Sequence, residues 1–237
     1  MSKTFQFKQF SINQDRTAMK VGTDGVLLGA WTKVEQNPDT ILDIGTGTGL
    51  IALQMAQRSF AETIDALEIE AVAFEQAVAN FEASPWADRL FCYHASLQEF
   101  VNEMDDRYDL IVSNPPFYAE TMGSGSDARD TARQELSLPF DTLLAGVAKL
   151  LTPKGEFTTV IPYKEESEFL KKANLLGLHV YRITHVKGTP SAQIKRSLLQ
   201  FSFESQEMTN NMLIIETDRH NYTKDYIALT KDFYLKM

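Results

Sequence analysis

The sequence predicts an α/β fold, with a mostly parallel seven-stranded sheet that carries helices on both faces and an antiparallel hairpin at one edge. Two observations lead to this prediction. Short apolar β runs alternate with amphipathic helical patterns from residue 40 to residue 176, which is typical of parallel sheets covered on both faces. Two late β runs, Val180–Val186 and Ser197–Phe203, have no convincing helix between them and therefore indicate a hairpin.

The elements follow one another from a first strand near residue 40. Each expected strand is a short run rich in β-branched and apolar residues, and each expected helix repeats apolar residues every three or four positions. The expected strands are Thr40–Ile44, Thr63–Leu67, Leu90–Tyr93, Tyr108–Val112 and, after a turn at residues 153–155, Glu156–Ile161. The expected helices are Leu50–Arg58, Ala71–Glu82, Leu97–Glu103, Leu138–Leu151, Glu165–Leu176 and, near the end of the chain, Lys224–Leu235.

The composition is that of a soluble protein without disulfides or metal clusters. Of the 237 residues, 43% are hydrophobic and 23% are charged, which is ordinary for a globular chain. The single cysteine, Cys92, cannot form an internal disulfide, and no Cys/His spacing suggests a metal site. The N-terminus lacks the apolar core of a signal peptide, and no apolar run approaches the ~18 residues of a membrane span. We therefore expect a cytoplasmic location, no membrane contact and no metal.

The formal charge of −9 argues against a nucleic-acid partner, but the charges are segregated along the chain. Between Phe60 and Leu110, twelve acidic residues stand against two basic ones. The stretch Phe169–Phe203 has no acidic residue, and the first twenty residues carry a single one. We expect these two basic segments to meet an RNA, with chance clustering as the alternative. Their basic side chains are Lys3, Lys8, Arg16, Lys20, Lys171, Lys172, Arg182, Lys187, Lys195 and Arg196.

A glycine-rich turn, LDIGTGTGL, places Gly45, Gly47 and Gly49 after the first strand and before the first helix. In a Rossmann-like sheet this is the ligand crevice, and glycines there allow positive φ and a close approach of the backbone to a ligand. The dinucleotide spacing GxGxxG is broken because Leu50 replaces its third glycine. A nucleoside is therefore favoured over a pyrophosphate, and a plain structural turn is the alternative.

Two carboxylates accompany the glycine turn. Glu68 ends the second strand, nineteen residues after Gly49, and a carboxylate at this place can accept hydrogen bonds from two ribose hydroxyls. A solvated acid at a strand end is the alternative interpretation. Asp43 precedes the glycines and can either fix the turn or reach the ligand.

The sequence DIGTGTGL, the strand-end acid and the tetrapeptide NPPF at residues 114–117 occur in the order found in class I S-adenosylmethionine-dependent methyltransferases, which the chain resembles. The blocks FKQFSINQDRTAMKVGTDGVLLGAW, SPWADR, SNPPFY, KRSLLQFS and YIALTKDFYLKM further resemble the bacterial tRNA (adenine-N6) methyltransferases. This resemblance implies methyl transfer from S-adenosylmethionine to adenosine 37, just 3′ of the anticodon, in a tRNA such as tRNA-Val. It also implies a monomer with one methyltransferase domain over residues 1–237, divided into an N-terminal lid or extension (1–38) and a catalytic core (39–237).

The expected fourth strand runs into SNPPFYAE, an exit that two prolines make stiff. The Asn114 side-chain carbonyl and the Pro115 backbone carbonyl can accept the N–H groups of an exocyclic amine, which turns the nitrogen lone pair towards the methyl group. Pro116 keeps these groups in register. Phe117 can stack on the base, and Tyr118 either assists this stacking or only packs.

The resemblance leaves alternatives open, and five further residues belong to the expected site. NPPF also occurs in methyltransferases of guanine N2 and of protein glutamine, and a cofactor-binding RNA adaptor without turnover is the alternative from another class. Thr23 and Asp24 are the polar candidates in a lid over the cofactor, with a simple turn as the alternative. Ser96 stands where many relatives carry an Asp that contacts the cofactor adenine. Lys195 and Arg196 are expected to touch RNA phosphates.

Overall fold

The protein, described by a computed structural model over residues 4–17, 19–116 and 138–237, is built on one large twisted sheet. This sheet has eight strands in the order β10-β8-β9-β7-β6-β3-β4-β5, and all neighbouring pairs are parallel except those that involve β9. The strands are β3 (Thr40–Ile44), β4 (Thr63–Glu68), β5 (Leu90–His94), β6 (Tyr108–Ser113), β7 (Leu151–Pro162), β8 (His179–Lys187), β9 (Ile194–Ser202) and β10 (Thr209–Ile214).

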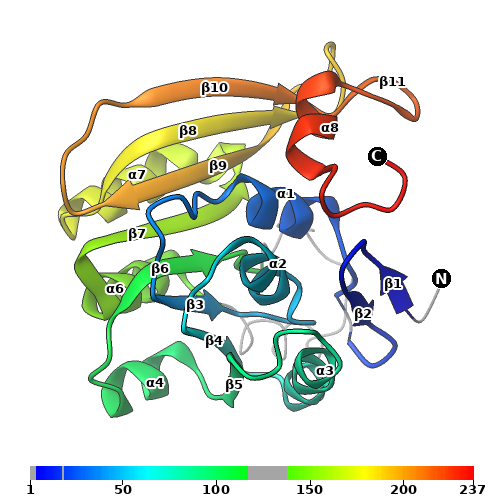
Figure 1. The fold of residues 1–237 in the computed structure, drawn as a ribbon. Coiled ribbons are helices and arrows are strands. Elements are labelled where there is room, and N and C mark those ends of the chain that lie inside the picture. Colours follow the sequence, from blue (N-terminus) through cyan, green and yellow to red (C-terminus); the bar gives the residue numbers. More distant parts are fainter. Residues whose placement is uncertain (1–3, 18, 117–137) are drawn as a thin grey trace, which may run out of the picture.

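Helices cover both faces of the sheet (Figure 1). On one face lie α1 (Thr23–Trp31), α2 (Leu50–Arg58), α3 (Ala71–Glu82) and α8 (Lys224–Thr230). On the other face lie α4 (Leu97–Glu103), α6 (Phe140–Leu150) and α7 (Glu166–Leu175), the last preceded by the 3₁₀ turn η1 (Tyr163–Glu165). Two small antiparallel pairs complete the description: β1 (Thr4–Gln6) with β2 (Ser11–Asn13), and β11 (Glu216–Asp218) with β12 (Asn221–Tyr222).

The predicted fold class is confirmed, but the sheet has one strand more than predicted. The segment Thr209–Ile214 pairs with β8 as β10, so the hairpin of β8 and β9 lies inside the sheet and not at its edge. β10 carries mostly exposed side chains, and its sequence TNNMLI has no clear alternation of apolar and polar residues. Its strand character therefore comes from the partner strand, which no local pattern reveals.

Two predicted boundaries also differ from the structure. The turn expected at residues 153–155 lies within β7, which starts at Leu151, and the pairing with β6 is irregular there, between Tyr108 and Leu110. The C-terminal helix was expected to reach Leu235 but ends at Thr230. No helix among the described residues is long and apolar enough to cross a membrane.

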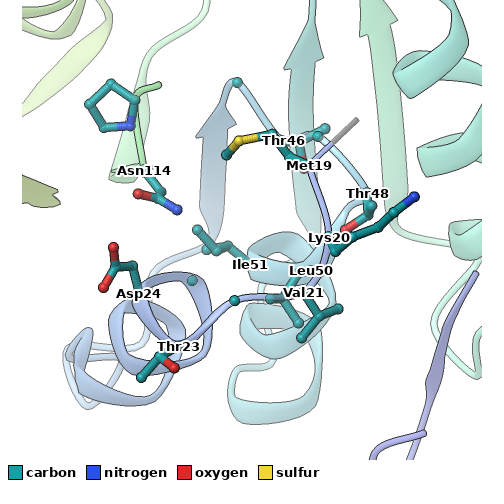
Figure 2. Close-up of a pocket in the computed structure, with 15 residues that line it drawn as sticks. Met19, Lys20, Val21, Thr23, Asp24, Thr46, Thr48, Leu50, Ile51 and Asn114 are labelled. Atoms are coloured by element: carbon teal, nitrogen blue, oxygen red, sulfur yellow. The ribbon is translucent and has the colours of Figure 1, made fainter. Parts of the chain in front are cut away.

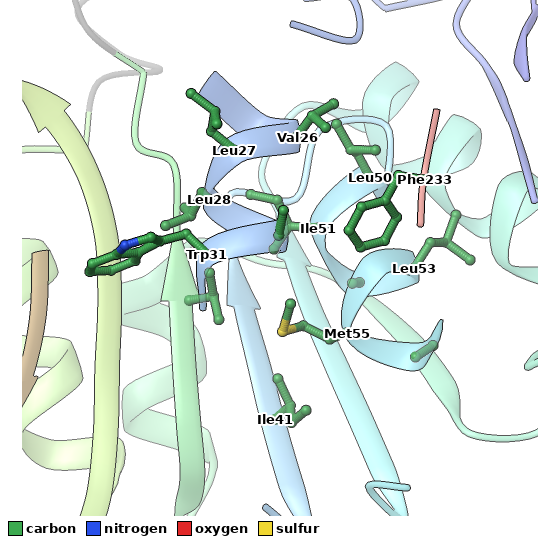
Figure 3. Packing of buried hydrophobic residues seen from close by; sticks show 14 of the residues in the cluster. Val26, Leu27, Leu28, Trp31, Ile41, Leu50, Ile51, Leu53, Met55 and Phe233 are labelled. Atoms are coloured by element: carbon green, nitrogen blue, oxygen red, sulfur yellow. The ribbon is translucent and has the colours of Figure 1, made fainter. Parts of the chain in front are cut away.

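The core lies on both faces because successive strand residues point to opposite sides. In β3, Ile41 joins the apolar cluster beneath α1 and α2, whereas Leu42 and Ile44 join the cluster beneath α4, α6 and α7. The first cluster also receives Phe233 from the end of the chain, beside Leu53 of α2 (Figure 3). Both faces of the central strands are therefore covered by buried apolar side chains, as is usual for parallel strands.

The N-terminal segment is packed against the rest of the chain. Phe7 and Phe10 are buried in the same apolar cluster as α2, and the backbone of Phe7 bridges that of Tyr234. The backbone N–H of Lys8 donates to the carbonyl of Phe233 at 2.8 Å. Residues expected to form an extension thus bring the two ends of the chain together beside the face of the sheet that α2 covers (Figure 1).

Candidate active site

A cavity of about 380 Å³ opens at the carboxyl ends of β3 and β6. After β3 the chain builds β4 and β5 on one side, and β6 is then added on the other side of β3. Ligands of open α/β sheets bind at such a switch point, because the loops that leave the two central strands diverge there. The cavity is lined by residues 19–25, residues 45–48, Leu50, Ile51, Asn114 and Pro115 (Figure 2).

The glycines of the predicted turn divide into two kinds. Gly45 and Gly47 have φ of +73° and +59°, line the cavity, and would meet no atom within 4 Å if they carried a Cβ. Gly49 also has positive φ, but its Cβ would lie 2.5 Å from the Phe81 ring. The first two therefore leave room for a ligand against the backbone, whereas Gly49 allows α2 to pack against α3.

Glu68 holds the glycine turn in place. Its Oε2 accepts a hydrogen bond from the backbone N–H of Gly47 at 2.8 Å, and its Oε1 accepts one from Glu70 at 2.9 Å. The side chain is only 9% exposed and does not line the cavity. Each carboxylate oxygen can accept a second hydrogen bond, so a ribose contact stays a prediction.

Asp43 lies beneath the turn, not in the cavity. It is fully buried, and its Oδ2 accepts hydrogen bonds from the Thr46 hydroxyl at 2.6 Å and from the Ala52 backbone at 3.1 Å. Burial raises the pKa of this carboxyl to about 7, against the opposing effect of its hydrogen bonds to Thr46 and Ala52, with a smaller upward contribution from Glu68. Asp43 thus fixes the turn, and its contact with a ligand stays a prediction, since its Oδ1 has no hydrogen-bond partner among the described residues.

Asn114 and Pro115 directly follow β6 and lie in the wall of the cavity, at the exit from the strand that the sequence predicts to be stiff. The Asn114 Oδ1 atom is buried and has no hydrogen-bond partner in the described part of the chain. A buried amide oxygen without a partner costs free energy, and such atoms are uncommon in folded proteins. Asn114 therefore has an acceptor that the described part of the chain leaves unused, and its side chain lies in the wall of the cavity (Figure 2).

Asp24 and Arg196 come together across the mouth of the site. Asp24 lies in the first turn of α1 and lines the cavity, and its Oδ2 accepts a hydrogen bond from Arg196 Nε at 2.7 Å. Both side chains are 32% exposed. Asp24 is a predicted contact of the cofactor and Arg196 a predicted contact of the RNA, and the structure joins these two side chains in one ion pair.

Similarity to known proteins settles the family. Residues 22–183 match the family model of the methyltransferase small domain. A tRNA1(Val) (adenine(37)-N6)-methyltransferase from Flavobacterium psychrophilum is 60% identical over 233 residues, which cover 98% of this chain and the whole of that protein. The chain belongs to this methyltransferase family. A second such enzyme, from Flavobacterium johnsoniae, is 58% identical over 98% of this chain and the whole of that protein.

Solved structures agree with this assignment at the level of the fold. The crystal structure of a protein described as a predicted O-methyltransferase, from Agrobacterium tumefaciens, superposes with a TM-score of 0.68 at 18% identity. The match covers 89% of this chain and 96% of that one. As a methyltransferase of this family, the protein uses S-adenosylmethionine as its methyl donor.

The cavity of this methyltransferase fits a nucleoside that carries a charged amino-acid chain. Its size falls within the usual range for small-molecule pockets, and Gly45 and Gly47 leave the backbone accessible. Asp24 and Thr23 add polar groups at the start of α1. Three apolar residues in the wall, Ile51, Met19 and Val21, were not predicted from the sequence. The only sequence signal for them is that each lies next to a segment predicted to form a turn or a lid.

Three other predicted site residues are placed elsewhere or lie outside the description. Ser96 caps α4: its hydroxyl accepts a hydrogen bond from the Glu99 backbone at 3.2 Å and donates one to the Glu99 carboxylate at 2.7 Å. It does not line the cavity, so its contact with the cofactor stays a prediction. Phe117 and Tyr118 lie outside the described residues.

Only part of the predicted basic surface lies at the site. Lys20 lines the cavity and donates to the carbonyl of Thr17 at 2.6 Å, whereas Arg16 pairs with Glu75 at 3.6 Å. On α7, Lys172 binds Asp141 at 2.6 Å. Arg182 stacks on the ring of Trp31, with 3.9 Å between the guanidinium carbon and the ring centroid. The predicted cations that remain at the carboxyl ends of β7 and β8 are Lys187, Lys195 and Arg196.

The described residues offer no metal centre and no reactive thiol. No group of three or more His, Cys, Asp or Glu side chains in this part of the chain is arranged to hold a metal ion. Burial raises the pKa of the Cys92 thiol to about 12, so this sulfur is protonated at neutral pH. Among the described residues we therefore find no group for metal-assisted catalysis and no thiolate nucleophile.

Proposed function

We propose that the protein methylates the exocyclic N6 amine of adenosine 37 in tRNA1(Val), acting as a cytoplasmic monomer on the anticodon stem-loop. The substrate is taken from full-length relatives that carry this name at 46–60% identity. S-adenosylmethionine, held at the glycine turn, supplies an electrophilic methyl group. The remaining steps belong to the protein's own residues.

The observation that carries this proposal is the Oδ1 atom of Asn114, in the wall of the cavity, which has no hydrogen-bond partner among the described residues. An exocyclic amine of adenine offers two N–H donors, and its lone pair is delocalised into the ring. The Asn114 oxygen accepts one N–H group and the Pro115 carbonyl accepts the other. This pair of hydrogen bonds draws the nitrogen towards tetrahedral geometry and localises its lone pair for attack on the methyl group.

No catalytic base is needed in this scheme. Attack by the amine nitrogen forms the bond to the methyl group as the bond between that methyl group and the donor sulfur breaks, which leaves a thioether. The nitrogen then carries a positive charge, the ring carbon, the new methyl group and two hydrogens, and it is acidic enough to lose one of its protons to water. The nearby Asp24 is bound to Arg196 and is not required to accept that proton. The hydrogen bonds of Asn114 and Pro115 fix the direction of attack, and Pro116 keeps the strand exit stiff.

The test uses unmodified tRNA1(Val) transcript and labelled S-adenosylmethionine, followed by digestion to nucleosides. We expect N6-methyladenosine with the natural transcript and no product when position 37 is guanosine or a purine without the exocyclic amine. The variant Asn114→Ala serves as the inactive control. A methylated guanosine, a methylated protein glutamine, or cofactor binding without any transfer to tRNA would overturn the proposal.

A further inference from the structure

An exposed tyrosine follows the end of β7 beside the proposed active site. Tyr163 opens the turn η1 directly after Pro162 and is 42% exposed. In the parallel pair of β6 and β7, Ser113 lies opposite Thr159. Asn114 directly follows β6 and Tyr163 directly follows β7, so both lie at the same edge of the sheet, with Tyr163 beyond the level of Asn114.

The ring of Tyr163 is held by a group that the proposed methyl transfer does not use. It meets the His185 ring edge to face, with 5.1 Å between the centroids and 84° between the planes. His185 Nε2 lies 2.8 Å from Glu166 Oε2, and the Ser197 hydroxyl donates to the same oxygen. The side chains of His185 and Glu166 are 13% and 17% exposed. One side of the tyrosine ring is thus in contact with a nearly buried network.

Two lysines belong to the same group of strand ends as this tyrosine. Lys195 lies in β9, which pairs with β7, and is exposed, and Lys187 ends β8. Arg196, opposite Pro162, instead binds Asp24 of α1. An exposed aromatic ring and two lysines thus lie at one group of strand ends. Single-stranded RNA is held by the same combination, because every base has a face that stacks and every phosphate is an anion.

We propose that Tyr163 is a stacking platform for an unpaired base of the RNA substrate, a nucleotide next in the chain to the adenosine that is methylated. His185 and Glu166 act as positioning residues that keep the ring in place. This inference rests on the proposed function, because it assigns a second base site to the same RNA.

The test compares Tyr163→Ala with Tyr163→Phe on an anticodon stem-loop substrate. The loss of one stacked base should raise KM for the RNA about tenfold or more in Tyr163→Ala, with kcat and cofactor affinity nearly unchanged. Tyr163→Phe keeps the ring and should behave as the wild type. Phe60→Ala is the matched control: Phe60 is 99% exposed, but it lies between α2 and β4, at the opposite end of the strands. It should leave KM unchanged.

A binding measurement separates this inference from the proposed function. Stem-loops that carry 2-aminopurine at position 36 or 38 report stacking by fluorescence, whether or not methyl transfer occurs. We expect quenching at one of these positions by the wild type and Tyr163→Phe, a reduced effect with His185→Ala, and none with Tyr163→Ala. Failure of methylation by the wild type would overturn the proposed function alone. Equal KM and equal quenching for wild type and Tyr163→Ala, both folded by thermal melting, would overturn the stacking site.

Discussion

The two walls of the cavity treat their polar groups differently. On the wall formed by β3, the glycine turn and β4, the carboxylates bind the turn itself: Glu68 accepts from Gly47, and Asp43 accepts from Thr46. On the second wall, at the end of β6 and the start of α1, the oxygen of Asn114 has no partner in the described residues, and Asp24 shares with Arg196 an ion pair that is one-third exposed. Except for the buried Oδ1 of Asp43, which also has no partner in the described residues, the carboxylate oxygens of the first wall are bound within the protein. The second wall carries polar groups that a ligand can bind.

This difference fits the different requirements of cofactor binding and of transition-state stabilisation. A cofactor that returns in every cycle is bound best by a rigid, preformed surface, since no free energy is lost in ordering it. A transition state is stabilised best by groups that become fully paired only when the reaction proceeds. The unpartnered acceptor of Asn114 costs stability in the free protein, and the amine of the substrate satisfies it.

The largest expected effect concerns Asn114. Replacement by Ala removes one of the two acceptors on the amine and should lower the single-turnover rate by at least ~10²-fold, as for the loss of one transition-state hydrogen bond. The affinity for S-adenosylmethionine should change little, because the glycine turn is untouched. Rapid-quench measurements with saturating cofactor give the rate. A rate close to that of the wild type would mean that the two walls do not differ in the way described.

The next effect concerns Asp43, the one carboxylate of the first wall with an unpartnered oxygen. Its pKa is raised from 3.8 to about 7 in the folded protein. Below pH ~4 the group is protonated in both states and has no effect. Between pH ~4 and ~7 the unfolded chain releases this proton while the folded chain retains it, so the free energy of unfolding falls as pH rises, by about 2–4 kcal/mol in all.

Urea unfolding of the cofactor-free protein from pH 4 to pH 8 measures this slope. Asp43→Asn carries no titratable group and should flatten the curve over that range. Asp105→Asn, at an exposed position, should keep the wild-type slope. If the curves of wild type and Asp43→Asn run parallel, the buried carboxylate does not oppose folding in this way.

A slightly smaller effect is expected at Glu68. Glu68→Ala should weaken S-adenosylmethionine binding by roughly 1.5–3 kcal/mol, the scale of a hydrogen bond to a charged group. The structure adds a second reason, since the variant also frees the N–H of Gly47 that orders the turn. Titration calorimetry measures the dissociation constant, and Glu70→Ala is the matched control from the same loop. An unchanged constant in a folded Glu68→Ala protein would place the ribose contact elsewhere.

The first wall could be predicted from sequence more fully than the second. β3, α2 and α3 match their predicted bounds, because their signals are local: an apolar run, a glycine turn and a helical repeat. β10 has no such signal and depends on its pairing with β8. The same holds for the Asp24–Arg196 pair, whose members are 172 positions apart. Contacts at that separation follow from topology, which one sequence does not reveal.

The smallest expected effect concerns the contribution of the basic side chains to RNA binding. Sequence analysis treated the N-terminal cations and the later basic stretch alike, whereas the structure pairs Arg16 with Glu75 and leaves Lys195 exposed beside the site. Counterions leave the RNA only where a cation approaches a phosphate. Lys195→Ala should therefore lower the slope of log affinity against log salt by somewhat under ~1, similarly for every RNA sequence.

Arg196 should behave differently from Lys195, because its guanidinium already binds Asp24. A phosphate gains less from a cation that it must share with a carboxylate. The double variant Lys195→Ala/Arg196→Ala should thus change the slope by less than twice the effect of Lys195→Ala, and Arg16→Ala should leave it unchanged. Filter-binding titrations of tRNA between 50 and 200 mM salt, on the order of physiological ionic strength, measure these slopes. Equal effects of Arg16→Ala and Lys195→Ala would show that exposure beside the site does not decide which cations meet the RNA.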